Sequence, residues 1–206
     1  MGCTAGDVAG AVRAVAVVVA EHRMEVIQLD RAIGDGDHGE NLDRGFKAVV
    51  AKLDESTPDT PGGVLKLVAT TLISKVGGAA GPLYGTAFLR AATAVGDATD
   101  LGPAEVLEGL RAALGGVVAR GKAEVGDKTM VDALDPAVQA AEKAGDSVAG
   151  LLAAAADAAA VGAESTVPLV ARKGRASYLG ERSAGHLDPG ARSTMLLLRS
   201  LADSAL

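Results

Sequence analysis

Cysteine and aromatic residues are almost absent from this sequence of 206 residues, and both absences limit the fold. Cys3 is the only cysteine, so the chain cannot form an internal disulfide, which fits a reducing compartment such as the cytoplasm. There is no tryptophan, and aromatic residues make up only 2% of a chain that is 49% hydrophobic. The core must therefore be built from alanine, valine and leucine, which favours helices that approach one another closely.

The sequence also lacks an excess of basic residues and a long uninterrupted apolar run. The net charge of −6 argues against a general nucleic-acid binder. The apolar run near the N-terminus is interrupted by Arg13 and soon reaches Glu21, His22 and Arg23. It is too short and too charged to span a membrane, and no cleavable signal pattern follows it. We therefore expect a cytoplasmic protein that binds neither nucleic acid nor a membrane directly.

Strand signals are almost absent, and most of the chain shows the periodic apolar spacing of helices. Residues 167–170 are the only candidate strand, and we interpret them as a helix end or a loop. We expect one domain, residues 1–206, since no linker is long enough to divide it. The expected fold is an all-α antiparallel bundle or barrel, with helices at residues 7–28, 42–54, 64–76, 82–95, 103–120, 128–144, 147–163 and 189–201.

One short stretch concentrates three carboxylates, which belong to Asp30, Asp35 and Asp37. The glycines among them allow the backbone to turn sharply and to approach a ligand closely. Carboxylates this close repel one another, so a cation is expected among them, and oxygen ligands on a short loop suit Mg²⁺ or Ca²⁺ better than zinc. The helix expected just after the loop offers free N–H groups and a positive dipole end, which attract phosphate.

Two other interpretations apply to the same stretch. Aspartate and glycine in this arrangement are common in plain surface turns, and on this stretch alone a turn explains the pattern as well as a metal site does. An EF-hand is excluded by counting from Asp35. The sixth position is then Glu40, where glycine is required, and the twelfth is Phe46, where a bidentate glutamate is required.

Alternate connections between the expected helices are unusually rich in glycine and polar residues, namely residues 30–41, 77–86, 121–130 and 172–190. In an antiparallel bundle or barrel, alternate connections lie at the same end of the molecule. The four segments should therefore converge on one rim and form a single site.

The second and third of these connections are weak signals by themselves. The glycines of residues 77–86 permit close backbone contact with phosphate, but a helix–helix turn can be equally rich in glycine. Residues 121–130 are not a P-loop, because Asp127 stands where Walker A needs lysine and no strand precedes the segment. A solvated charged turn is the default interpretation of that segment, although it could contact a nucleotide.

The fourth connection carries a positive cluster in an acidic protein, formed by Arg172, Lys173, Arg175 and Arg182. Arginine presents a forked donor that suits phosphate oxygens. The loop could instead be held by its own salt bridges. Asp188 followed by proline also makes a plain helix start, which is compatible with a ligand contact.

Taken together, these segments resemble the Dak2-type domain, the nucleotide-binding L subunit (DhaL) of dihydroxyacetone kinases. The resemblance covers nearly the whole chain and rests on LDRAIGDGDHG at 29–39, GGAAGPLYGT at 77–86, RGKAEVGDKTM at 120–130, and ARKGRASYLGERS with GHLDPG at 171–190. Four such motifs in order are far more specific than any one of them. The resemblance implies a barrel of eight antiparallel helices with a nucleotide site at one rim.

The resemblance also implies a set of site residues. Asp30, Asp35 and Asp37 would hold two Mg²⁺ ions that bridge the phosphates of ADP or ATP, and with Arg175 they would form the catalytic set. Relatives usually have serine in place of Ala80, so one hydroxyl donor is missing and nucleotide binding should weaken rather than vanish. The nucleotide contacts implied by the motifs are His38, Gly39, Glu40, Asn41, Ala79, Ala80, Gly121, Met130, Arg175, Asp188, Pro189 and Gly190.

The activity that this resemblance implies is phosphoryl transfer from a Mg-nucleotide to dihydroxyacetone, which a separate DhaK-type subunit holds through a histidine. His38 is not expected to be that histidine, because it lies in the phosphate loop. A DhaM-type phosphotransferase subunit fed by phosphoenolpyruvate would recharge the bound nucleotide. Two alternatives stay open: an ATP-dependent kinase subunit for another short ketose such as erythrulose, and a nucleotide-sensing module that contacts a transcriptional regulator.

Overall fold

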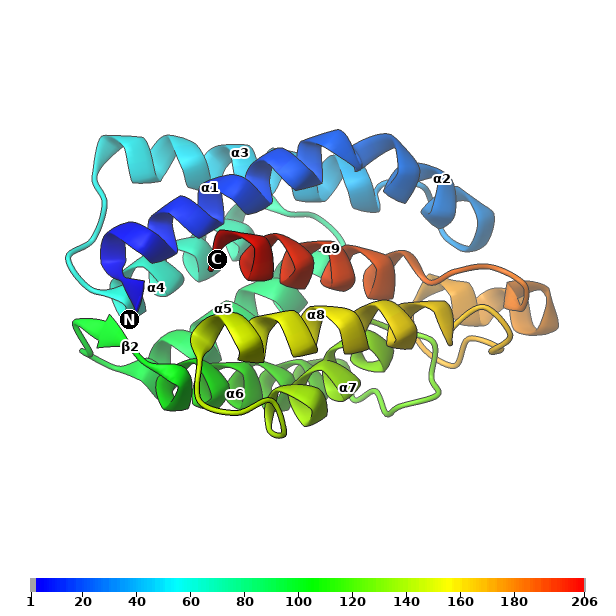
Figure 1. The fold of residues 1–206 in the computed structure, drawn as a ribbon. Coiled ribbons are helices and arrows are strands. Elements are labelled where there is room, and N and C mark those ends of the chain that lie inside the picture. The colour runs from blue at the N-terminus through cyan, green and yellow to red at the C-terminus, as the bar shows by residue number, and fades with distance from the viewer. Residues whose placement is uncertain (1–2, 206) are drawn as a thin grey trace.

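The structure is a computed structural model that describes residues 3–205, and these residues are almost entirely helical (Figure 1). The long helices lie roughly along one common direction and pack side by side. The predicted all-α fold is therefore confirmed. In chain order the elements are β1 (Cys3–Thr4), α1 (Ala5–Glu21), α2 (Arg23–Ile33), α3 (His38–Glu55), α4 (Pro61–Lys75), α5 (Ala80–Val95), β2 (Asp100–Leu101), α6 (Pro103–Gly121), α7 (Val131–Ala141), α8 (Val148–Glu164), the 3₁₀ helix η1 (Arg175–Ser183) and α9 (Pro189–Ser204).

The first predicted helix is interrupted at His22 and extends further than expected. Because α2 continues to Ile33, Asp30 lies in a helix rather than in the loop. At the break, His22 Nδ1 lies 2.6 Å from one carboxylate oxygen of Glu25, and the other oxygen accepts a hydrogen bond of 2.6 Å from Arg192 of α9. This contact joins residues far apart in the sequence, so local periodicity does not reveal it.

Four other helices begin at residues that apolar spacing misplaces. The structure starts α3 at His38 instead of residue 42, α4 at Pro61 instead of 64, α5 at Ala80 instead of 82, and α7 at Val131 instead of 128. The first turns of α3, α4 and α5 are rich in glycine, proline and polar residues, so they lie outside the apolar pattern that predicts a helix. The corrected start of α3 places residues 38–41 in its first turn.

Small residues let the helices pack closely, as the scarcity of aromatic residues predicted. Phe46 and Tyr84 are the aromatic residues of the described core, which otherwise consists mainly of alanine, valine and leucine. A Cβ on Gly162 of α8 would lie 2.2 Å from the carbonyl oxygen of Asp132, so the two backbones touch. Pro136 lies inside α7 without ending it. Its nitrogen has no hydrogen, so it cannot donate the usual helical hydrogen bond to the Asp132 carbonyl four residues earlier.

Strands play a minor part in the described chain. β1 and β2 pair antiparallel, with Cys3 opposite Leu101 and Thr4 opposite Asp100. Two residues are too few to show alternation, so the sequence did not predict this pair. Residues 167–170 form a turn and loop after α8, as interpreted from the sequence. No helix in the part that the structure describes is long and apolar enough to cross a membrane.

The direction of the helices alternates along the chain. α1 with α2, α4, α6 and α8 run toward one end of the molecule, and α3, α5, α7 and α9 run back from it (Figure 1). Each long helix packs against the next, and α9 packs against α1. The connections at residues 34–37, 76–79, 122–130 and 165–188 therefore lie at the same end, as the alternation of special segments predicted.

Candidate functional site

Three carboxylates meet at the end of α2. Asp30, on its last turn, is buried, whereas Asp35 and Asp37 follow on the exposed loop, and one oxygen from each lies within 4.8 Å of the others. The backbone N–H of His38 donates a 3.1 Å hydrogen bond to Asp30 Oδ2. A Cβ on Gly34 would lie 2.1 Å from Asp30 Oδ1, so glycine at this position leaves room for the carboxylate where it lies. The sequence argument that these three aspartates converge is confirmed.

A positively charged side chain from a distant part of the sequence, Arg175, contacts this cluster. The guanidinium of Arg175, at the start of η1, lies 3.0 Å from Asp35 Oδ2, and two-thirds of the arginine side chain is exposed. The salt bridge crosses the site instead of holding the loop to itself. A side chain with this exposure can turn toward another anion at small cost, because surface pairs contribute only about 0–1 kcal/mol.

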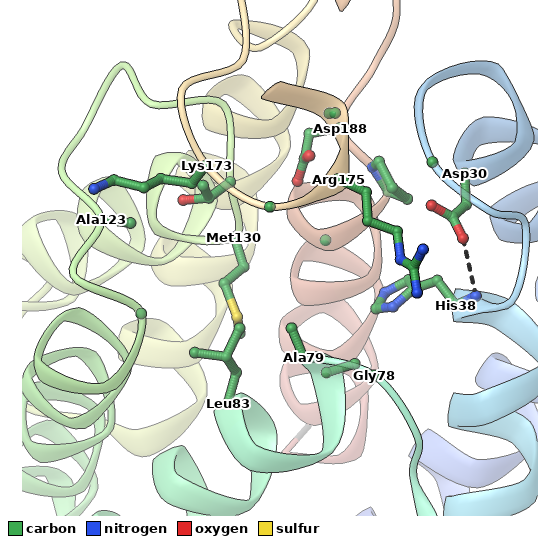
Figure 2. A pocket seen from close by; sticks show the side chains of 18 of the residues that line it. Asp30, His38, Gly78, Ala79, Leu83, Ala123, Met130, Lys173, Arg175 and Asp188 are labelled. Carbon is green, nitrogen blue, oxygen red and sulfur yellow. Dashed lines mark hydrogen bonds between the residues drawn. The ribbon is translucent and has the colours of Figure 1, made fainter. Parts of the chain in front are cut away.

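Beside the aspartates lies an open cavity of about 510 Å³ (Figure 2). Figure 2 shows Asp30, His38 and Arg175 on one side of it, Gly78 and Ala79 at its base, and Lys173 with Ala123 on the opposite side. All four special connections supply lining residues, which confirms that they converge at one end of the molecule. The predicted residues that line it are Asp30, Asp35, Asp37, His38, Ala79, Ala80, Gly121, Met130, Arg175, Asp188, Pro189 and Gly190.

Three predicted nucleotide contacts are not among the lining residues. Gly39 packs against α2, where a Cβ would lie 2.4 Å from the carbonyl oxygen of Arg23. Glu40 forms a 2.7 Å salt bridge with the same arginine. Asn41 accepts a hydrogen bond from Arg44 and lies against Gly77, which starts the second special connection. In this structure all three brace the walls of the cavity, and their contact with a nucleotide stays a prediction.

Four helices start at the cavity. The residues at the N-termini of α3, α5, α7 and α9 all line it, so their N–H groups and positive dipole ends are directed to one region. Neither Ala79, which precedes α5, nor Met130, which precedes α7, provides a side-chain cap. These ends can bind an anion such as phosphate.

A buried hydrogen-bond network, which sequence reasoning missed, ties three of these helices together. His38 Nε2 lies 2.8 Å from Ser193 Oγ, and the same hydroxyl lies 2.7 Å from the phenol oxygen of Tyr84. Burial lowers the pKa of His38, so the neutral imidazole is favoured, and burial raises the pKa of Tyr84 to about 12. Tyr84 was inside a recognised motif, whereas Ser193 carried no signal. The network positions α3, α5 and α9 relative to one another.

Lys128 is a second residue that sequence reasoning missed, and it corrects the interpretation of residues 121–130 as a solvated turn. Its side chain is only 1% exposed, and it lines the cavity. Its backbone is left-handed, with φ of 63°, which delays the start of α7.

Asp188 is also buried. It caps α9 by accepting a 2.7 Å hydrogen bond from Ala191 N–H, and burial raises its pKa to about 7.

Known proteins are similar to this chain over most of its length. Residues 32–203 match the DAK2 domain. The chain is 49% identical over 180 residues to the "PEP-dependent dihydroxyacetone kinase, ADP-binding subunit DhaL" of Escherichia coli K12, covering 86% of each chain. It is 43% identical over 183 residues to the ADP-binding subunit DhaL of PEP-dependent dihydroxyacetone kinase 1 of Listeria innocua, covering 89% of this chain and 88% of that one.

The fold is similar to that of a larger enzyme. The crystal structure of the dihydroxyacetone kinase from C. freundii in complex with AMP-PNP and Mg²⁺ matches with a TM-score of 0.74 and 27% sequence identity. The match covers 99% of this chain but only 35% of that one, so the chain spans about a third of the enzyme.

Proposed function

We propose, on the premise that this chain belongs to the DAK2 domain family, that it is the nucleotide-binding subunit of a dihydroxyacetone kinase. The observation that carries this proposal is the single cavity where three carboxylates, Arg175 and four helix N-termini meet. Its volume of about 510 Å³ is that of an ordinary small-molecule site. Two relatives of similar length are named as ADP-binding subunits, which supports ADP or ATP as the ligand.

The aspartates fit Mg²⁺ as the companion of the nucleotide. Oxygens on one Mg²⁺ ion lie about 3 Å apart when adjacent and about 4 Å apart when opposite. Three carboxylate oxygens within 4.8 Å of one another are close to that spacing, which supports Asp30, Asp35 and Asp37 as Mg²⁺ ligands. The number of ions, two, is our proposal from the family resemblance. The bound ions would neutralise negative charge on the phosphates.

The remaining catalytic work is positioning. The N-termini of α3 and α5 would bind phosphate oxygens through backbone N–H groups, and the Arg175 fork would balance charge on the group in transfer. No nucleophile of the chain is needed, because phosphoryl transfer depends mainly on alignment and charge neutralisation.

We also propose the assembly in which the subunit acts. Dihydroxyacetone would be held on a DhaK-type subunit, and a DhaM-type phosphotransferase subunit would recharge the nucleotide from phosphoenolpyruvate, in the cytoplasm. A transcriptional regulator is a further candidate partner. The eight long helical segments would close into a barrel, which the contact between α9 and α1 supports.

The first test concerns the acceptor. This chain, supplied with ATP, Mg²⁺ and dihydroxyacetone, should form no dihydroxyacetone phosphate alone. It should form the product when a DhaK-type subunit is added together with a DhaM-type subunit and the phosphotransferase proteins that supply it from phosphoenolpyruvate. The reason is that the proposal assigns the nucleotide to this chain and the ketose to its partner. A coupled assay of product formation measures both conditions. Product made by this chain alone, or none with the full set of partners present, would refute the proposed division.

A second prediction concerns Ala80, the first residue of α5. Ala80→Ser should tighten Mg-ADP binding by up to about tenfold, since it adds one hydroxyl donor beside the free N–H groups of the helix start. Calorimetry measures the change, with Ala51→Ser on the exposed surface of α3 as control. Equal affinities in both variants would mean that the phosphates do not lie at the start of α5.

A further inference from the structure

Two lysines of the loop at residues 122–130 have a left-handed backbone, but they differ in burial and in whether they line the cavity. Lys122 has φ of 50° and Lys128 has φ of 63°, a region that non-glycine residues seldom enter. Lys122 is exposed, whereas Lys128 is buried to 1% exposure. Unusual backbone conformations cluster at functional sites, but only Lys128 also lines the cavity.

The ammonium group of Lys128 binds both ends of the long loop between α8 and α9. We call these two ends, residues 166–167 and 185–188, the neck of the loop. It donates a 2.6 Å hydrogen bond to the carbonyl oxygen of Thr166, at the start of the loop, and another to the carbonyl oxygen of His186, at its end. Two more bonds close the same neck. Gly185 N–H donates to the Val167 carbonyl at 2.7 Å, and Asp188 N–H donates to Thr166 Oγ1 at 3.0 Å.

The part of the loop between the two ends of the neck contains η1. Arg175, the first residue of η1, forms the salt bridge with Asp35. The only contact in the neck made by a charged side chain is that of Lys128, among the described residues. Hydrogen bonds from a charged donor are stronger than neutral ones, and one ammonium group bonds a carbonyl at each end of the loop. The neck geometry therefore depends on Lys128 more than on any of its neutral hydrogen bonds.

We propose that Lys128 is a positioning residue, which clamps the neck of the α8–α9 loop and so places Arg175 over the nucleotide site. This inference rests on the proposed function for its binding test, but the loop test below is independent of any ligand. The proposed role of Lys128 differs from those of the aspartates and Arg175, because Lys128 would act by positioning Arg175 and not by contacting the metal or the nucleotide.

The ligand-free test is hydrogen exchange of the whole protein. In Lys128→Met, which keeps the length and unbranched shape of the side chain, amides of residues 175–183 should exchange at least about tenfold faster, while those of α4 and α5 stay unchanged. Lys122→Met is the matched control, with the same loop and left-handed backbone, and should change neither region. Unchanged exchange in η1 would overturn the proposal. Faster exchange throughout the chain would also overturn it, because Lys128 would then support the core in general.

The binding test is a double-mutant cycle with Arg175→Ala. Lys128→Met should weaken Mg-ADP binding by roughly tenfold in the wild-type background and by less than about twofold when Arg175 is already alanine. Additive losses would show that Lys128 contacts the nucleotide directly and would refute a positioning role. If the wild-type protein binds no Mg-ADP, the proposed function fails, and the exchange test alone decides the role of Lys128.

Discussion

Asp35→Asn should weaken the binding of Mg-ADP by more than about a hundredfold, which corresponds to roughly 3 kcal/mol. The substitution keeps the shape of the side chain and removes the negative charge that a divalent cation requires. Asp35 is the aspartate of the cluster that also pairs with Arg175, so its loss removes a metal ligand and leaves an extra positive charge at the cavity. The net charge of the site therefore moves away from what Mg²⁺ prefers.

The fold should survive this substitution. The salt bridge between Asp35 and Arg175 is largely exposed, and such pairs contribute only about 0–1 kcal/mol to stability. Circular dichroism and thermal melting of the nucleotide-free protein check this, and calorimetry measures the affinity. Asp146→Asn, in the exposed connection between α7 and α8, is the control and should leave affinity unchanged. Wild-type affinity in Asp35→Asn would refute the assignment of the carboxylates to the metal.

Arg175→Ala should weaken ADP binding by about ten- to a hundredfold, because a charged hydrogen bond to phosphate contributes about 1.5–3 kcal/mol. In the free protein the guanidinium lies 3.0 Å from Asp35. When the phosphates bind, the arginine would exchange one anionic partner for another without crossing the site. Arg175→Lys should recover only part of the affinity, since a point charge replaces a planar fork.

The melting temperature of nucleotide-free Arg175→Ala should barely change, because two-thirds of the side chain is in solvent. Arg182→Ala, in the same 3₁₀ helix and also exposed, is the control, and we expect no loss of affinity from it. If Arg175 only holds its loop through the salt bridge, the opposite result is expected: the nucleotide-free variant is slightly less stable, and its ADP affinity is unaltered. Measuring both quantities on each variant distinguishes the two roles.

Periodic apolar spacing and loop composition were sufficient to predict the helices and their convergent connections. The order of the helices, the all-α class and the meeting of four segments at one rim all followed from patterns local to each segment. Asp30, Asp35 and Asp37 lie within eight residues of one another, so their convergence needed only a tight loop. Arg175 reached them because alternate connections share an end.

The features that the sequence missed depend on contacts between distant residues. The break at His22 coincides with a contact between Glu25 and Arg192, and the burial of Lys128 depends on carbonyl groups of another loop. Lys128 looked like a solvated charge because its neighbours in the sequence are polar. The starts of α3 and α5 were misplaced because glycine and polar residues form their first turns, and these two starts line the cavity where a phosphate site needs free N–H groups.

The measurement that tests the central claim most directly is native mass spectrometry of the purified protein beside Asp35→Asn, both with ADP and Mg²⁺ added. The account predicts one ADP with two Mg²⁺ ions on each wild-type chain and neither on the variant. Wild-type protein that carries no nucleotide, or a variant that carries as much as the wild type, would contradict the claim that the carboxylates and Arg175 form a Mg-nucleotide site.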